Sequence, residues 1–91
     1  MSDKMEMIDV GAWFDTILTE YKRAKKLHPV WPTDPIHAAA VVSEEAGELV
    51  RAANRFWYEG ASEDEMVDEA VQVGAMAIRF LIGIGGYRGM K

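Results

Sequence analysis

Apolar side chains recur at every third or fourth position over three long stretches of the chain, residues 5–27, 35–58 and 62–82. This spacing places them on one face of an α-helix, whereas a half-buried strand would alternate with a period of two. In the first stretch, Val10 and Phe14 begin a stripe that continues at helical spacing to the end of the stretch. The pattern predicts an all-α fold with three main helices and no strand.

Local signals place the ends of the first two predicted helices. The first is expected to stop before Pro29, because the residue that precedes a proline is pushed out of the helical region. A proline-rich loop follows. Asp34 then has the position of an N-cap, and Pro35 is suited to the first helical residue. These residues predict that the second helix begins at residue 35.

The third helix has its own boundary signals. Gly60 can adopt the left-handed conformation that ends the second helix. Ser62 opens the third helix, and Glu65 is placed to reach back and complete a capping box. Gly83 and the glycines after it end this helix, so we expect residues 83–91 to form a flexible tail.

The composition predicts self-association of a single domain that spans residues 1–91. Apolar residues make up 49% of the chain, including six Met and three Trp. A domain this small buries a modest share of its surface, and three helices rarely hide so much apolar material. We therefore expect an antiparallel bundle of three main helices that is completed by homo-oligomerisation, as a homo-dimer or homo-tetramer.

The charge and the missing residue types exclude several classes of protein. The net charge of −5 counts against a stable nucleic-acid partner, which would require a basic face. The chain has no cysteine, so thiolate metal sites and cysteine nucleophiles are excluded. We see no signal-peptide pattern and no apolar run of membrane-spanning length, so we expect a cytoplasmic location without membrane contact.

Three carboxylates interrupt the small and apolar residues of the second helix. Glu45 and Glu48 are three residues apart and share a face, and Glu45 lies at the edge of the apolar stripe. Glu44 is turned by about 100° from Glu45 around the helix. Carboxylates in a partly apolar setting are costly to desolvate, so they call for a physical explanation.

The third helix repeats this arrangement. Glu65, Glu69 and Gln72 lie on one line, and Asp68 begins the neighbouring line. If the second and third helices pack antiparallel, their acidic sections can approach one another. A divalent cation such as Mg²⁺ would relieve the repulsion between them, because it prefers oxygen ligands. The same spacing also permits a second interpretation, in which the acids are surface residues paired with nearby arginines.

A longer motif goes beyond spacing. The segment Glu44-Glu45-Ala46-Gly47-Glu48-Leu49 is followed by Glu65-Met66-Val67-Asp68. Together they resemble the EExxE…ExxD signature of the MazG-like, all-α nucleoside triphosphate pyrophosphohydrolases. The wider stretch, residues 31–82, resembles the short single-domain members of this family, including phage-encoded ones.

The resemblance implies a reaction and a set of residues. A nucleoside triphosphate, (d)NTP, would be hydrolysed between its α and β phosphates to (d)NMP and pyrophosphate, with Mg²⁺ or Mn²⁺ as the cofactor. Glu45 and Glu48 would be catalytic metal ligands, and Glu44 would orient or deprotonate the attacking water. Relatives form dimers or tetramers of helical bundles, with the site between helices and often between subunits.

The second ligand pair has two possible registers. Glu65 and Asp68 match the letters of the family motif. Glu69 and Gln72 lie on the more apolar line, but glutamine then stands where the family has aspartate. Because Glu69 lies on the more apolar face of the helix, we favour it as a metal ligand. Glu65 and Asp68 are then alternative ligands or supporting acids. Both registers stay open at this point.

Cations and an aromatic ring complete the predicted site. The leaving pyrophosphate needs positive charge in the transition state, and Trp31 could stack on a nucleobase. The candidate substrate-binding residues are Trp31, Lys22, Lys25, Arg51, Arg55, Gln72 and Arg79. The alternative function is a catalytically silent helical oligomer that binds a nucleotide or a protein, and the glutamine at position 72 is the feature that favours it.

Overall fold

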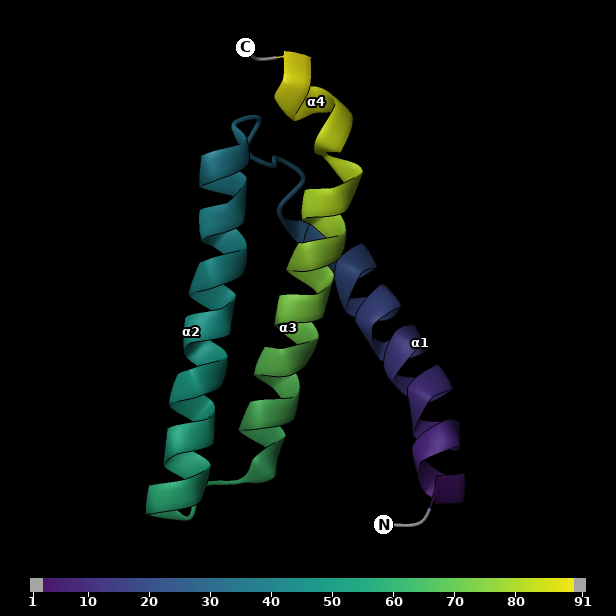
Figure 1. Cartoon of the computed structure of the whole chain (residues 1–91), viewed down its shortest axis with the longest axis vertical. Helices are drawn as coiled ribbons and strands as arrows, with labels where there is room; N and C mark the ends of the chain where they lie inside the picture. The colour runs from purple at the N-terminus through teal and green to yellow at the C-terminus, as the bar shows by residue number, and fades with distance from the viewer. Residues whose placement is uncertain (1–2, 90–91) are drawn as a thin grey trace.

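The computed structural model of the chain describes residues 3–89, and this part contains helices and no strand. The elements are α1 (Asp3–Leu27), α2 (Pro35–Glu59), α3 (Glu63–Ile82) and α4 (Ile84–Gly89) (Figure 1). The prediction of an all-α fold with three main helices is confirmed. The bounds of α1, α2 and α3 differ from the predicted ones by at most two residues.

The helix ends follow the local signals, with one exception. The Asp34 carboxylate accepts a 3.0 Å hydrogen bond from the Ile36 amide, and Gly60 ends α2 with φ of 69°. The Ser62 hydroxyl accepts a 3.1 Å hydrogen bond from the Asp64 amide. Glu65 does not reach back to Ser62; its carboxylate accepts hydrogen bonds from an arginine of α2 instead. The second half of the predicted capping box is therefore wrong.

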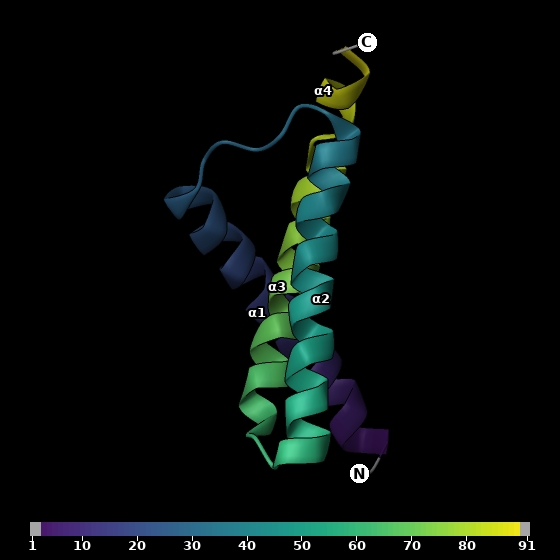
Figure 2. The ribbon, with the colours of Figure 1, turned by 90° about the vertical axis from the view of Figure 1, so that its left-hand side faces the viewer.

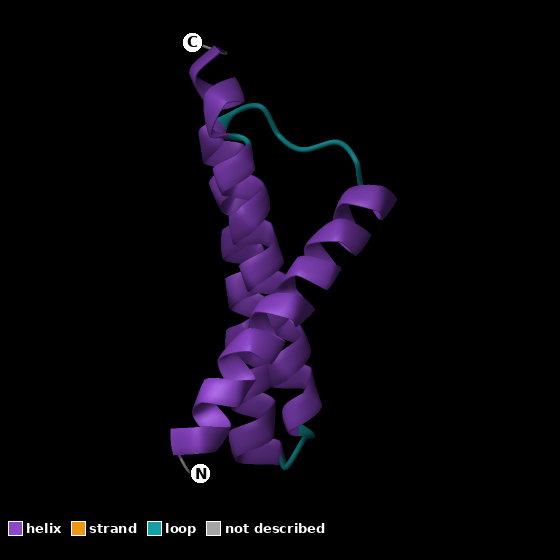
Figure 3. Ribbon diagram, turned by 90° about the vertical axis from the view of Figure 1, so that its right-hand side faces the viewer, coloured by secondary structure: helices purple, strands orange, loops and turns teal. Residues whose placement is uncertain are grey.

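Helices α2 and α3 lie side by side and antiparallel, whereas α1 crosses α3 and diverges from α2 (Figures 1 and 3). Figure 2 shows the loop that joins α1 to α2 reaching over to the N-terminal end of α2. The contact between α1 and α3 depends on Gly74, because a Cβ atom there would lie 3.0 Å from the Ile17 Cδ1 atom. A glycine at this point lets the two helices approach closely.

The core is small and is built largely from alanines. Ala24, Ala75 and Met76 form its buried centre, and Ala38 and Ala52 are buried along α2. The partly buried side chains packed against this centre are Tyr21, Trp31, Val41 and Val42. Among residues 10–87, no large side chain is completely buried. The three helices thus meet along narrow lines and leave much apolar surface uncovered.

The segment after Gly83 differs from the flexible tail that the glycines predicted. Residues 84–89 form the short helix α4, and residues 90–91 lie outside the described part of the chain. Tyr87 is buried, and its hydroxyl accepts a 2.6 Å hydrogen bond from the Trp31 indole. Its ring centroid lies 5.2 Å from that of Phe80. A partner distant in sequence holds this segment in place.

None of the described helices combines the length and the apolar character needed to cross a membrane.

Candidate functional site

The acidic sections of α2 and α3 come together around Glu45. This side chain is partly buried, and burial raises its pKa above the ordinary value. The neighbouring charges of Glu69, Glu48, Glu44 and Glu20 raise the pKa further, in that order of importance. These carboxylates therefore lie close enough to Glu45 to interact with it electrostatically. The free energy of ionising Glu45 depends on all of them.

One cavity lies between the acidic sections of α2 and α3. It has a volume of about 360 Å³, and Glu48, Asp68 and Glu69 contribute to its walls. Glu65 also lines it, but both its oxygens accept 3.0 Å hydrogen bonds from Arg55 Nη1. The arginine pairing expected of a surface carboxylate therefore occurs at Glu65, while Glu69 is the acid of α3 that most raises the pKa of Glu45.

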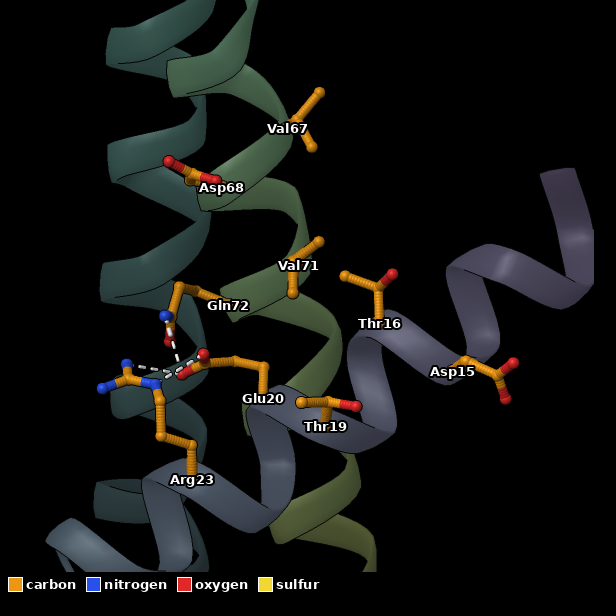
Figure 4. Close-up of a pocket in the computed structure, with 9 residues that line it drawn as sticks. All are labelled: Asp15, Thr16, Thr19, Glu20, Arg23, Val67, Asp68, Val71 and Gln72. Carbon is orange, nitrogen blue, oxygen red and sulfur yellow. Dashed lines mark hydrogen bonds and ion pairs between the residues drawn. The ribbon is translucent and has the colours of Figure 1, made fainter.

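Helix α1 adds a carboxylate that the sequence reasoning missed. Glu20 accepts a 2.8 Å hydrogen bond from Gln72 Nε2 and 2.8 Å hydrogen bonds from Arg23 Nε and Nη2 (Figure 4). The Arg23 hydrogen bond is the main cause that lowers the pKa of Glu20; burial opposes it, and Gln72 reinforces it. A carboxylate thus stands beside Gln72, the position where the Glu69 register of the predicted motif would have an aspartate.

A signal for Glu20 was present in the sequence. Trp13, Ile17, Glu20 and Ala24 follow one another at intervals of four, three and four residues. These positions share one face of α1, and Ala24 is buried there. An acid on the contact line of a helix is as unusual as Glu45 on α2, and it identifies Glu20 as a residue of the site.

A second cavity joins Glu45 to the proline-rich loop. Its volume is about 310 Å³, and its walls include Glu20, Glu45, Gln72, Trp31 and Arg79. Arg79 is only 8% exposed, donates a 2.7 Å hydrogen bond to the backbone oxygen of His28, and lies 4.8 Å from the centroid of the Trp31 ring. The loop is therefore fixed to α3 by Arg79, which the sequence suggested as a candidate substrate contact.

A third cavity has a volume of about 570 Å³ and is lined by residues of α1 and α3 (Figure 4). It is lined by Glu20, Arg23 and Gln72, which also line the second cavity, and by Asp68. Asp68 also lines the first cavity. Polar walls thus extend from Trp31 past Glu45 and Gln72 to Asp68, and Arg23 is a further cation on this surface that the sequence reasoning left out.

The remaining candidates lie at or beyond the margin. Glu44 is exposed on α2, next to Glu45. Lys22 and Lys25 are exposed on α1, and Arg51 is exposed but lines the cavity that holds Glu48. Among the described residues, no three acidic or histidine side chains form a ready-made metal-binding group. The carboxylates interact electrostatically, but they are not gathered closely enough to form a preassembled metal site.

No protein-family model, no curated protein and no solved structure matches the chain.

Proposed function

We propose that this chain is a Mg²⁺-dependent nucleoside triphosphate pyrophosphohydrolase of the MazG-like kind, which converts a (d)NTP and water to (d)NMP and pyrophosphate. The observation that carries the proposal is the convergence of Glu48, Asp68 and Glu69 on one cavity between α2 and α3, next to the partly buried Glu45. Burial and the charges of Glu69 and Glu48 both oppose its ionisation. A protein that holds several carboxylates against their mutual repulsion has the arrangement expected of a cation site.

The residues that would hold the cation fit its chemistry. Glu45, Glu48 and Glu69 supply hard oxygen ligands from two facing helices, and Mg²⁺ binds through few carboxylates together with water and phosphate oxygens. When bound, it would neutralise triphosphate charge and activate water for hydrolysis. Glu65 is held by Arg55, so we assign it a supporting role. Asp68 lines the same cavity as Glu48 and Glu69 and remains an alternative ligand.

The cavities suggest how a nucleotide would lie. Trp31 and Arg79 line one end of the cavity that contains Glu45, so we assign the nucleoside to that end. The triphosphate would then extend past Glu45 toward Asp68. Three arginines lie along this path, since each lines a cavity with Asp68: Arg23, Arg51 and Arg55. Lys22 and Lys25 would act at longer range, and the working form would be a homo-oligomer.

A second function has one observation in its favour. Gln72 is neutral where the Glu69 register of the predicted motif would have an aspartate, and its amide is already bonded to Glu20. A site that had lost this ligand would retain the bundle and bind a nucleotide or a protein without turning it over. Glu20 places another carboxylate beside position 72, although this carboxylate is paired with Arg23.

Turnover of a nucleotide panel tests the proposal. Purified full-length protein is incubated with ribo- and deoxyribonucleoside triphosphates, with Mg²⁺, with Mn²⁺ or with a chelator, and pyrophosphate is measured. We expect release with either metal and none with the chelator. Glu48→Gln should lower kcat by at least about 100-fold, the size typical of a lost electrostatic contact to the transition state.

The control for this variant is Glu59→Gln, the same change at an exposed carboxylate at the end of α2. It should retain full activity. Absence of pyrophosphate from every member of the panel would reject the enzyme. Saturable nucleotide binding without turnover would then support the silent-oligomer function.

A further inference from the structure

The ring of Trp31, in the loop between α1 and α2, is held at its face and at its edge. The Arg79 guanidinium lies over the ring, 4.8 Å from its centroid, and donates a 2.7 Å hydrogen bond to the backbone oxygen of His28 in the same loop. The indole Nε1 donates a 2.6 Å hydrogen bond to the Tyr87 hydroxyl of α4. Two partners that are distant in sequence therefore fix the orientation of Trp31.

Tyr87 is itself well anchored, although it belongs to the short helix α4. It is only 6% exposed, and its ring packs on Phe80 of α3. A buried hydroxyl requires a hydrogen-bond partner, because an unpaired polar group in an apolar setting costs free energy. The Trp31 indole supplies that partner. Figures 1 and 2 show α4 at the end of the molecule where α2 begins, so the contact joins the C-terminal part of the chain to the loop before α2.

Gly83 makes room for the Tyr87 hydroxyl. Its backbone has φ of −77° and ψ of −4°, a right-handed conformation that any residue can adopt, so no turn requires glycine there. A Cβ atom at residue 83 would lie 2.7 Å from the Tyr87 hydroxyl oxygen. At Gly85, in the same segment, a Cβ atom would meet nothing within 4 Å. The position of the hydroxyl therefore explains the missing side chain at residue 83.

The Trp31 ring has one face left for a ligand. Arg79 covers the other face at 4.8 Å, and a base between the two groups would need about 7 Å, twice the usual contact distance between carbon atoms. The ring is partly exposed and lines the cavity that also contains Glu45. A base can therefore stack only on the face turned away from Arg79.

We propose that Tyr87 is a positioning residue for nucleotide binding, whose hydroxyl holds the Trp31 ring in the plane on which the base stacks. This role rests on the proposed function, which assigns the nucleoside to the Trp31 end of the site. A ring that is already fixed loses less conformational freedom when the base binds, so the affinity is higher. Stacking accepts every base. The contribution of Tyr87 should therefore be similar for all four bases and absent for a ligand without a base.

Binding of intact nucleotides tests this role. The full-length protein in Mg²⁺ is titrated calorimetrically with the α,β-methylene analogues of the four deoxynucleoside triphosphates, and with inorganic triphosphate. Tyr87→Phe keeps the ring that packs on Phe80 and removes only the hydroxyl. It should weaken binding of the analogues by about fivefold, the size of one lost hydrogen bond, and that of inorganic triphosphate by less than about twofold. Tyr58→Phe, the same change at an exposed tyrosine, should alter neither.

Two further comparisons show whether the effect passes through Trp31. In a Trp31→Phe background, which lacks the indole donor, Tyr87→Phe should change the affinity by less than about twofold, because the hydrogen bond is already lost. Gly83→Ala, which displaces the hydroxyl, should reproduce the loss seen with Tyr87→Phe, and Gly85→Ala should not.

The outcomes separate the role of Tyr87 from the enzymatic activity. The role is overturned if no analogue binds, if Tyr87→Phe leaves the analogues unaffected, or if it weakens inorganic triphosphate equally. A nucleotide-specific loss in a protein that releases no pyrophosphate would support the role and reject the enzyme. Normal turnover with an unchanged nucleotide KM in Tyr87→Phe would reject the role and retain the enzyme.

Discussion

The two sides of α2 show how one helix can carry two incomplete surfaces. The side that faces α3 places Glu45 among other carboxylates, and their charges raise its pKa. Another side of α2, which we call the outer seam, has no charged side chain, and much of it is exposed. Its members are Ile36, Ala39, Ser43, Ala46, Val50, Ala53 and Trp57. Because the helix has 3.6 residues per turn, residues next to each other in sequence belong to different sides, so each surface keeps a uniform chemistry.

The two sides of α2 therefore differ in the kind of ligand that would complete them. The acidic side contains like charges, which a cation would neutralise, and the proposed ligand is small and positive. The outer seam contains no charge and exposes apolar side chains over a large area. Only a macromolecule is large enough to cover that area. Changes on one side should therefore alter turnover and leave the assembly intact, and changes on the other should do the reverse.

The largest expected effect separates the two registers on the acidic side. Glu69→Gln should lower kcat by about 100-fold or more, because Glu69 acts directly on Glu45. Glu65→Gln should change kcat by less than about fivefold, since it breaks an ion pair whose partners are 44% and 41% exposed, worth under about 1 kcal/mol. Steady-state kinetics of both variants decides the matter; a larger loss at Glu65 would reverse the assignment.

The next effect concerns the outer seam, which we expect to be the contact surface of the proposed homo-oligomer, and uses two adjacent aromatics. Trp57 and Tyr58 are 76% and 79% exposed, but only Trp57 lies on the seam. Trp57→Ala should raise the dimer dissociation constant by about 30-fold, or about 2 kcal/mol, as expected for an aromatic anchor that fills a groove of the partner. Tyr58→Ala should leave it within about threefold. Sedimentation over a dilution series measures both, and equal losses would place the interface elsewhere.

Gly47→Ala distinguishes a free helix from a covered one. In an isolated chain, alanine should stabilise α2 by about 0.5–1 kcal/mol, because glycine is the weaker helix former. In a dimer joined through the outer seam, which Gly47 borders, the added methyl group opposes the close approach of the second helix. Unfolding at low and high protein concentration should therefore show stabilisation only when the protein is dilute. An equal gain at both concentrations argues against a helix packed at this point.

The smallest effect tests the strain at Glu45. Its pKa in the folded protein is raised, so the folded state binds more protons than the unfolded state just above the ordinary carboxyl pKa, and stability falls as pH rises through that window. Without divalent cation at pH 7, Glu45→Gln should be more stable than the native chain, by less than about 1 kcal/mol because Glu45 is only partly buried. The difference should shrink below about pH 4.

Added Mg²⁺ gives this stability comparison its control. The cation should raise the melting temperature of the native chain and of Glu59→Gln, and it should have little effect on Glu45→Gln. A variant that is less stable than the native chain at pH 7 would show that Glu45 is a structural carboxylate.

Much of the fold was predictable because the determining interactions are local. Asp34, Pro35 and Gly60 act on the backbone within a few residues, so they place the ends of α2 wherever the helix finally packs. The antiparallel packing of α2 and α3, which lets their acidic sections face one another, was also predictable, since two helices joined by a short turn run antiparallel.

The part that could not be predicted involves residues far apart in sequence. Tyr87 belongs to a glycine-rich segment with weak helical preference, and its order comes from Trp31 in the loop before α2. The position of α1 also depends on residues far away in the sequence. Its apolar stripe is compatible with packing on α2 or α3; in the structure α1 packs on α3, and Ile17 lies against Gly74 there.

By itself, the sequence determined the helices, their ends and the two chemically distinct sides of α2, because hydrogen bonds within a helix and the 3.6-residue period act over one or two turns. Tertiary structure alone decided that α1 crosses α3, that Glu20 joins Gln72 and Arg23 beside Glu45, and that Arg79 fixes the Trp31 loop. These contacts depend on which surfaces fit together in space, and side-chain shape across distant segments sets that fit.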